Sequence, residues 1–177
     1  MESMHQLQGI KQSNIKRLFS ATFIDQVLDT LAGKKYFSFL DEFSGYNQIQ
    51  VAPEDQDKNT FTFPWGTYAY RVLPFGLWNA PATFQRAVLR IFSNLIHDCV
   101  EVYMDDFIVY GDSFNEALEN LEKSLIRCKK TNLLLTHEKC FMMFNEGIVL
   151  GHHISRDRIK VDSSKVEVIS KLSVPSC

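Results

Sequence analysis

Two adjacent aspartates, Asp105 and Asp106, lie between two short hydrophobic runs and are the residues of this chain best suited to chemistry. The runs, residues 99–102 and 107–110, are rich in Val, Ile, Tyr and Phe, which favours a strand pair with the aspartates at its turn. Two neighbouring carboxylates repel each other unless a cation joins them. Mg²⁺ prefers carboxylate oxygens and keeps positions open for phosphate. A solvated acidic turn is the commoner explanation of such a pair, so the rest of the chain must decide.

A third carboxylate, Asp41, stands 64 residues before Asp105, at the end of residues 36–40, which alternate as a short strand. Residues 42–49 then form a turn with Gly45 at its tightest point. If the strand that ends at Asp41 lies beside the hairpin, three carboxylates complete a two-metal site. Such sites hold ions roughly 3.5–4 Å apart and clamp the attacking and leaving oxygens of a phosphoryl transfer. The sequence permits this geometry without showing it.

The composition predicts a packed globular chain of one domain, or one domain and a part. Of its 177 residues 45% are hydrophobic and 12% are aromatic. No apolar run approaches the length of about 20 residues that spans a bilayer, so no membrane partner is expected. The four cysteines form no CxxC pair and no metal spacing, which favours a reduced intracellular setting. The cytoplasm and the nucleus are the favoured compartments, and an organelle is the less favoured alternative.

The charge is unevenly distributed, although its sum is only −2. Residues 1–40 carry 5 basic and 3 acidic groups, residues 41–112 carry 4 and 10, and residues 113–177 carry 10 and 8. The middle part, at −6, holds all the candidate metal ligands. A nucleic-acid enzyme with such an acidic centre needs divalent cations and flanking basic surface to tolerate a phosphate backbone.

Helical spacing of apolar residues predicts three helices. The first runs from Thr22, a possible cap, to Leu31, with Gly33 as its stop. The second starts at residue 80 with a proline in its first turn and continues to Ile96. The third is capped by Asp112 or Ser113, and its expected core face consists of Phe114, Leu118, Leu121, Leu125, Ile126 and Cys128.

Short alternating runs predict the remaining strands. Residues 60–63 and 68–73 form a hairpin around residues 64–66, and residues 141–161 form an antiparallel group with Gly147 and Gly151 at turns. This order of elements predicts an α+β layer, an antiparallel sheet with two helices on one face. In that layout Asp41 and the Asp105–Asp106 turn can lie on adjacent strands.

Together these segments resemble the reverse transcriptase of Gypsy-type LTR retrotransposons, especially plant elements. The resemblance covers residues 23–175 and leaves residues 1–22 unassigned. Its matching stretches are FSFLDEFSGYNQI (37–49), APEDQDKNTFTFPWGTYAYRVLPFGLWNAPATFQRAVLRIF (52–92), VEVYMDDFIVYG (100–111) and EKCFMMFNEGIVLGHHIS (138–155). A lone YMDD is modest evidence, but the order and spacing of all four stretches match as well.

The resemblance implies the palm of a right-hand polymerase, with part of the fingers and the start of the thumb. Its implied function is that of an RNA-directed DNA polymerase, which adds deoxynucleotides to a primer on an RNA or DNA template. Asp41, Asp105 and Asp106 match the catalytic ligands of two Mg²⁺ ions, for which Mn²⁺ can substitute. A different two-metal enzyme, such as a nuclease, lacks support. Beyond the shared carboxylates, nothing in the chain resembles the additional acidic and basic groups of a nuclease.

The resemblance also implies a site for deoxynucleoside triphosphates, formed by Ser44, Gly45, Tyr46, Phe75 and Gly76. The backbone of Ser44 and Gly45 resembles a phosphate cradle, since glycine lets a backbone approach phosphate closely. Tyr46 matches the aromatic gate that clashes with a ribose 2′-OH, the group that separates RNA from DNA. The alternative for Tyr46 is a core aromatic.

Further matched positions are expected at the template and primer: Gln85, Tyr103, Met104, Leu150, Gly151 and His152. An exposed helix residue is the alternative for Gln85. His152 and His153 do not indicate zinc, because adjacent residues of a strand point to opposite faces.

The chain also departs from the family pattern. Residues 1–22 show no convincing counterpart of the basic fingers segment, and the resemblance includes no RNase H, integrase or protease region. Trp78 stands where the LPFGLxNAPATF pattern usually has a smaller residue, and an effect on packing is expected. These departures keep open a second hypothesis, an inactive retrotransposon relic that is at most a weak nucleic-acid or protein-binding module. The missing fingers, thumb and RNase H regions of an intact pol protein are a further expected partner.

Overall fold

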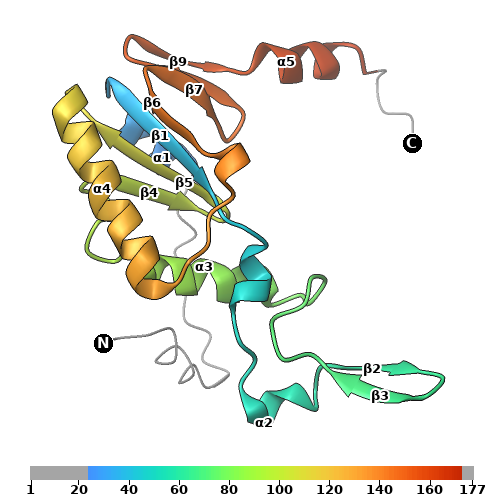
Figure 1. Ribbon diagram of the computed structural model, residues 1–177. Helices are drawn as coiled ribbons and strands as arrows, with labels where there is room; N and C mark the ends of the chain where they lie inside the picture. The colour runs from blue at the N-terminus through green and yellow to red at the C-terminus, as the bar shows by residue number, and fades with distance from the viewer. Residues whose placement is uncertain (1–23, 173–177) are drawn as a thin grey trace.

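The centre of the molecule is a four-stranded antiparallel sheet, seen in a computed structural model that describes residues 24–172 (Figure 1). Its strands lie in the order β4 (Val100–Tyr103), β5 (Asp106–Gly111), β1 (Tyr36–Asp41) and β6 (Phe141–Phe144). The predicted strand that ends on Asp41 and the predicted hairpin around the aspartates are therefore confirmed as neighbours. The α+β fold expected from the sequence is confirmed with them.

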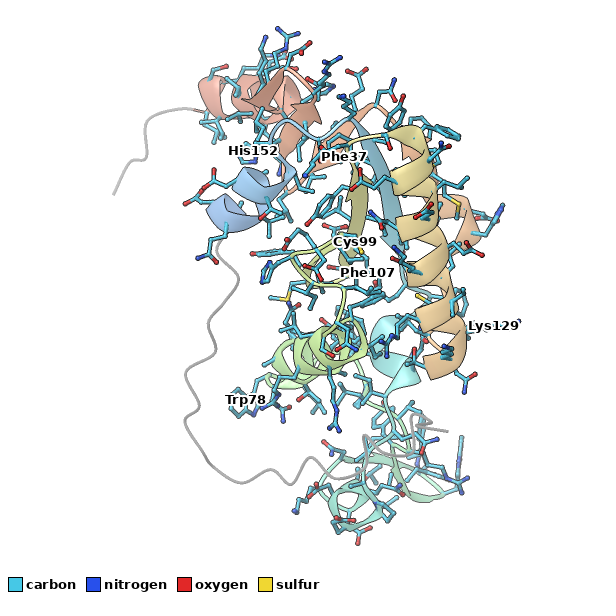
Figure 2. All side chains as sticks on the ribbon, turned by 90° about the vertical axis from the view of Figure 1, so that its left-hand side faces the viewer. Phe37, Trp78, Cys99, Phe107, Lys129 and His152 are labelled. Carbon is cyan, nitrogen blue, oxygen red and sulfur yellow. The ribbon has the colours of Figure 1, made fainter. Side chains whose placement is uncertain are left out.

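Two helices, α3 (Ala80–Ile91) and α4 (Phe114–Thr131), pack on one face of this sheet, as predicted. Alternation along the strands directs Leu40, Phe107 and Val109 to that face, where they are at most 2% exposed. Phe107 lies in the interior of the body in Figure 2. Ser113 begins α4 by accepting a hydrogen bond from the Glu116 backbone N–H with its Oγ (3.2 Å), which selects one of the two predicted caps.

The opposite face is covered by α1 (Ile24–Leu31) and by a second sheet of three strands. The strands are β7 (Glu146–Val149), β8 (His152–Ser155) and β9 (Arg158–Val161), each antiparallel to its neighbour. Residues of both coverings bury Phe37 and Ile108 in a second hydrophobic cluster. The sequence analysis did not predict that α1 and these three strands would cover the other face of the sheet. The helix α5 (Ser163–Ser170) follows and extends away from the body (Figure 1).

A small extension projects from the other end of the molecule (Figure 1). It consists of the short helix α2 (Pro53–Gln56) and the hairpin of β2 (Thr60–Phe63) and β3 (Gly66–Ala69). Two 3₁₀ turns, η2 (Gly45–Gln48) and η3 (His137–Lys139), flank the end of β1. No helix in the described part of the chain is both long and apolar enough to cross a bilayer.

Several element boundaries differ from the prediction. The second strand of the extension covers residues 66–69 rather than 68–73, because its two-residue turn pairs Phe63 directly with Gly66. The helix α3 ends at Ile91 instead of Ile96, and the Leu95 carbonyl then accepts three backbone N–H groups where the chain reverses into β4. Thr22, the predicted cap of the first helix, lies outside the described residues.

The core faces and turns also differ in part. Phe114, Leu118 and Ile126 of α4 are about half exposed, and smaller residues face the sheet instead: Ala117, Asn120 and Ser124. Gly147 lies within β7 opposite Ile154 rather than at a turn. A Cβ atom there would come within 2.3 Å of the Phe39 ring, so close packing explains this glycine. Gly151 does lie at a turn, with φ of +77°.

Gly111 lets α4 approach the end of β5 closely, and this contact gives a stability prediction. A Cβ atom at Gly111 would lie 2.6 Å from the backbone nitrogen of Ala117 and 2.8 Å from its Cα. Because a backbone cannot rotate out of the way, Gly111→Ala is expected to lower the free energy of unfolding by about 2–3 kcal/mol in urea titrations.

Gly33→Ala is the matched control, since nothing lies within 4 Å of the added atom and only its φ of +78° is unfavourable. Its expected cost is about 1 kcal/mol. Equal losses in the two variants would show that the contact with α4 is not what requires Gly111.

Candidate active site

The three predicted aspartates lie at one end of the central sheet. Asp41, the last residue of β1, is the direct cross-strand partner of Asp106, the first residue of β5. Directly paired residues point to the same face with Cβ atoms roughly 5 Å apart. Asp106 also pairs with Tyr103 across the β4–β5 hairpin, which leaves Met104 and Asp105 as its two-residue turn. The structure therefore brings Asp41 and Asp106 together and places Asp105 next to them.

The negative charges at this end of the sheet affect one another. Although Asp106 is exposed as a residue, partial burial of its carboxylate, followed by the charges of Asp105 and Asp41, raises its pKa. One cation offsets part of this repulsion, because the Lys139 Nζ lies 3.5 Å from the Asp41 Oδ1. The Lys139 side chain is 67% exposed, so this ion pair is a weak constraint.

Glu42 is a fourth carboxylate of the site, and the sequence analysis did not include it. Burial raises its pKa to about 7, and the charges of Asp105, Asp41 and Asp106 add to the effect. Its Oε2 is buried and has no hydrogen-bond partner among the described residues. Its place directly after Asp41 was the available sequence signal. Four carboxylates thus contribute to the potential at this end of the sheet.

The donor set fits a hard divalent cation. All candidate ligands are carboxylate oxygens, and their mutual repulsion is the condition that a bound cation relieves. Within residues 24–172, however, no three Asp, Glu, His or Cys side chains converge closely enough to enclose an ion. The structure thus provides ligands on adjacent strands rather than a closed coordination shell.

Tyr46 lies beside these carboxylates on the turn that follows β1. Its half-buried ring packs edge-on against Phe84 of α3 (centroids 5.4 Å apart) and at a tilt against Phe75 (5.6 Å). Burial raises its pKa, as do the charges of Asp105 and Glu42, which places the ring near both groups. The packing on Phe84 agrees with a core contact, and the nearness to Asp105 agrees with a role at the site.

The remaining predicted nucleotide residues gather around Tyr46. Ser44 adopts a left-handed conformation (φ 50°, ψ 51°) immediately before the 3₁₀ turn that starts at Gly45. Gly45 is buried, and a Cβ atom there would meet Glu42 at 2.5 Å and Phe84 at 2.7 Å, so the site itself requires a glycine.

Phe75, on the segment before α3, is 88% exposed apart from its contact with Tyr46, and Gly76 follows with φ of +97°. Trp78 on the same segment is 92% exposed and projects outward in Figure 2. The expected effect of Trp78 on packing is therefore wrong, because the ring packs into no core.

Gln85 lies under the turn formed by Met104 and Asp105, with only 9% of its surface exposed. Its Oε1 accepts a hydrogen bond of 2.7 Å from the Met104 backbone N–H. The alternative of an exposed helix residue is therefore wrong, and a contact with template stays a prediction. Tyr103, half-buried, and Met104, exposed, flank the turn at the surface.

The predicted primer residues occupy the turn between β7 and β8. Leu150 (φ 49°) and Gly151 (φ 77°) are both left-handed, as in the tight turns that suit hairpins. His152 Nδ1 lies 3.2 Å from the Leu150 carbonyl oxygen. A cavity of about 390 Å³ is lined both by Asp41 and Asp106 and by residues 146–149 of β7. The strand that leads into this turn thus shares a cavity with the aspartates.

The raised pKa of Glu42 gives a testable pH dependence. Its carboxyl group ionises near pH 4.5 in the unfolded chain and near pH 7 in the folded one. As the pH rises through this window the unfolded chain releases a proton that the folded chain keeps, so stability falls. In metal-free urea titrations Glu42→Gln should match the parent near pH 4.5. At pH 8 it should be more stable by about 1–2 kcal/mol after allowance for solvent screening.

The exposed Glu54 on α2 provides the control. Glu54→Gln should leave the pH profile of the parent chain unchanged. Parallel profiles for the parent and Glu42→Gln would contradict the burial of a costly charge at position 42.

Comparison with known proteins agrees with this geometry. The family model described as "Reverse transcriptase (RNA-dependent DNA polymerase)" matches residues 2–161, starting within the segment that the motifs leave unassigned. The Pol polyprotein of transposon 412 from Drosophila melanogaster is 39% identical over 168 residues, 93% of this chain and 14% of the relative. The corresponding polyprotein of transposon gypsy is 31% identical over 95% of this chain and 16% of the relative. The chain thus spans about one seventh of the length of these relatives.

Solved structures show the same fold. The foamy viral protease-reverse transcriptase, solved in complex with an RNA/DNA hybrid, superimposes with a TM-score of 0.73 at 24% identity. The match covers 84% of this chain and 20% of the viral one. The family model and the retrotransposon relatives each cover most of the chain, and the fold agrees with both. The chain belongs to the reverse transcriptase family, and its relatives are Pol polyproteins of Gypsy-type LTR retrotransposons.

Proposed function

We propose that this chain supplies the catalytic palm of an RNA-directed DNA polymerase. The observation that carries the proposal is the pairing of Asp41 with Asp106 across β1 and β5, with Asp105 in the adjoining turn. Phosphoryl transfer needs negative side chains that gather cations where charge develops on the reacting phosphate. Two carboxylates from adjacent strands and a third from the adjoining turn meet that need.

Asp41, Asp105 and Asp106 are the proposed ligands of two Mg²⁺ ions, with Mn²⁺ as a substitute. Bound divalent cations would lower the pKa of a primer 3′-hydroxyl and neutralise charge on a triphosphate. The chain's own part is to hold these carboxylates in register on a rigid sheet. Lys139 pairs with Asp41 through a single exposed contact, which a divalent cation can displace.

The nucleotide site is proposed at Ser44, Gly45, Tyr46, Phe75 and Gly76. The left-handed Ser44 next to the helical turn at Gly45 presents consecutive backbone N–H groups, an arrangement that suits the oxygens of a triphosphate. The Tyr46 ring is braced by two other aromatic rings, so it cannot easily yield to a ribose 2′-OH. Deoxynucleotides are therefore the preferred substrates.

An RNA or DNA template with its primer is the proposed nucleic-acid partner. The viral relative was solved with an RNA/DNA hybrid and with double-stranded DNA, and this chain shares its fold. The proposed contacts with template and primer are those of Gln85, Tyr103, Met104, Leu150, Gly151 and His152. The cavity that links β7 with Asp41 and Asp106 supports the primer part of this proposal.

The alternative of an inactive relic has less support. An inactive relic has no functional requirement for the β1–β5 register or for the three carboxylates. Both are intact in this chain. The chain spans 14% of the transposon 412 polyprotein, so its activity is best measured inside that larger protein.

The test is primer extension by a chimera in which residues 24–172 replace the matching segment of the transposon 412 polyprotein. With Mg²⁺ or Mn²⁺ and an RNA template, the chimera should extend a DNA primer. Asp105→Asn should lower the rate by at least about a hundredfold, because it removes charge at the reacting phosphate.

Metal binding is measured separately on the 177-residue chain. Millimolar Mn²⁺ should raise the thermal midpoint of the parent chain and leave that of Asp105→Asn unchanged. If the 177-residue chain responds to Mn²⁺ but the folded chimera binds the primer–template and extends nothing, the polymerase function is ruled out.

Tyr46 should determine the choice of sugar. Tyr46→Val removes the ring that blocks a 2′-OH, so the chimera should then incorporate ribonucleotides at least about tenfold better relative to deoxynucleotides. The measurement is the ratio of kcat/KM for the two nucleotides. Phe84→Leu, which disturbs the same packing but keeps the Tyr46 ring, is the control. An unchanged ratio in an active Tyr46→Val chimera would assign Tyr46 to core packing only.

A further inference from the structure

The catalytic turn contains a residue in an unfavourable backbone conformation. Met104 has φ of +55°, in the left-handed region where the Cβ of an L-residue crowds the following carbonyl. Asn132, which ends α4 with the same φ, belongs to a residue type that tolerates this region. Met104 has no polar side chain to compensate locally, and its side chain is 40% exposed. The pairing of β4 with β5 favours a positive φ in a two-residue turn, and an interaction from outside the hairpin can stabilise it further.

Gln85 supplies that interaction from α3. Its Oε1 accepts the Met104 backbone N–H at 2.7 Å, and its Nε2 lies 3.5 Å from the Val102 carbonyl oxygen. One side-chain amide thus joins the backbone of β4, at Val102, to the backbone of the turn, at Met104. The amide is buried, so losing either partner leaves a polar group without water to replace it.

The helix that carries Gln85 is fixed to the body of the molecule. Its neighbours Phe84 and Val88 are at most 4% exposed and pack in the core cluster that also holds Phe107 of β5. The hydrogen bond therefore ties the turn to the sheet-and-helix core, rather than only to the two strands of the hairpin. A two-residue turn held in this way has little freedom to move the carboxylates that follow it.

We propose that Gln85 is the positioning residue of the catalytic turn: its amide holds the Met104 peptide in the left-handed conformation and thereby directs Asp105 and Asp106 toward the cation site. The proposal rests on the polymerase function proposed above. It gives Gln85 a role inside the protein, distinct from a contact with template. Through this bond α3, which packs on one face of the sheet, positions Asp105 and Asp106. The third proposed ligand, Asp41, comes from β1.

The test is a double-mutant cycle on the 177-residue chain with Gln85→Met and Met104→Gly. Methionine keeps the length and apolar volume of glutamine but cannot replace its amide, and glycine adopts a left-handed φ without strain. The first measurement is the solvent exchange of the residue 104 amide proton by NMR. The second is the affinity for Mn²⁺ by paramagnetic relaxation of water.

Gln85→Met should speed exchange of the Met104 amide and weaken Mn²⁺ binding, each by about 3–10-fold, as expected for one hydrogen bond. In the Met104→Gly background the same change should leave Mn²⁺ affinity within about twofold. Gln85→Glu, which retains an acceptor of the same length, should keep the Met104 amide protected. Gln56→Met, which removes another side-chain amide bonded to a backbone carbonyl far from the turn, should change neither quantity.

Equal Mn²⁺ losses in both backgrounds would reduce Gln85 to a packing role and overturn the proposal, as would an unchanged amide exchange in Gln85→Met. A parent chain that binds no Mn²⁺ would contradict the metal-binding function instead, and amide exchange would then decide the backbone tether by itself. If Gln85→Met does not fold, loss of amide protection in Gln85→Glu would overturn the proposal, and retained protection there would support it.

Discussion

The antiparallel pairing of β1 with β5 is the interaction on which the rest of the site depends. Six consecutive residue pairs, from Tyr36 with Gly111 to Asp41 with Asp106, set one register along both strands. A slip by one residue would turn Asp106 to the opposite face of the sheet, away from Asp41. The register resists such a slip because both faces are buried under different coverings. A shift by one residue would turn Phe107 and Ile108 toward the wrong coverings and break two hydrophobic clusters at once.

The site combines contributions from both faces of this sheet. Asp41 and Asp106 continue the rows of Phe39 and Ile108, whose face is covered by apolar groups of β7. A low-dielectric wall on one side strengthens the field of charges at its edge, which explains why the carboxylates affect one another. From the other face, α3 contributes Phe84 behind Tyr46 and the buried amide under the turn. Packing on both faces of the central sheet therefore supports the end of the sheet that carries the carboxylates.

The sequence predicted those features that a local pattern encodes. Alternation identified β1 and its final Asp41, and the strand signals around the aspartates identified their hairpin. It did not predict which helix face would be buried: Gln85 turns inward because α3 crosses the hairpin end, and Phe114 stays outside because small residues of α4 face β5. Glu42 was missed for the same reason, since its backbone pairs with Leu135, ninety-three residues along the chain. Local periodicity carries no information about such tertiary neighbours.

The position of β1 between β5 and β6 has a consequence for how the protein is made. On the ribosome β1 emerges first, yet its partners begin at residues 106 and 141. At ordinary elongation rates roughly 4–14 s separate the synthesis of Asp41 from that of Gly111. During this time the apolar strand has no partner in its final sheet, and unpaired strands of this kind readily associate with other chains. A nascent chain with this topology therefore has an unpaired apolar strand for several seconds before its central sheet can form, and chaperones or temporary contacts of β1 with α1 would protect it during that time.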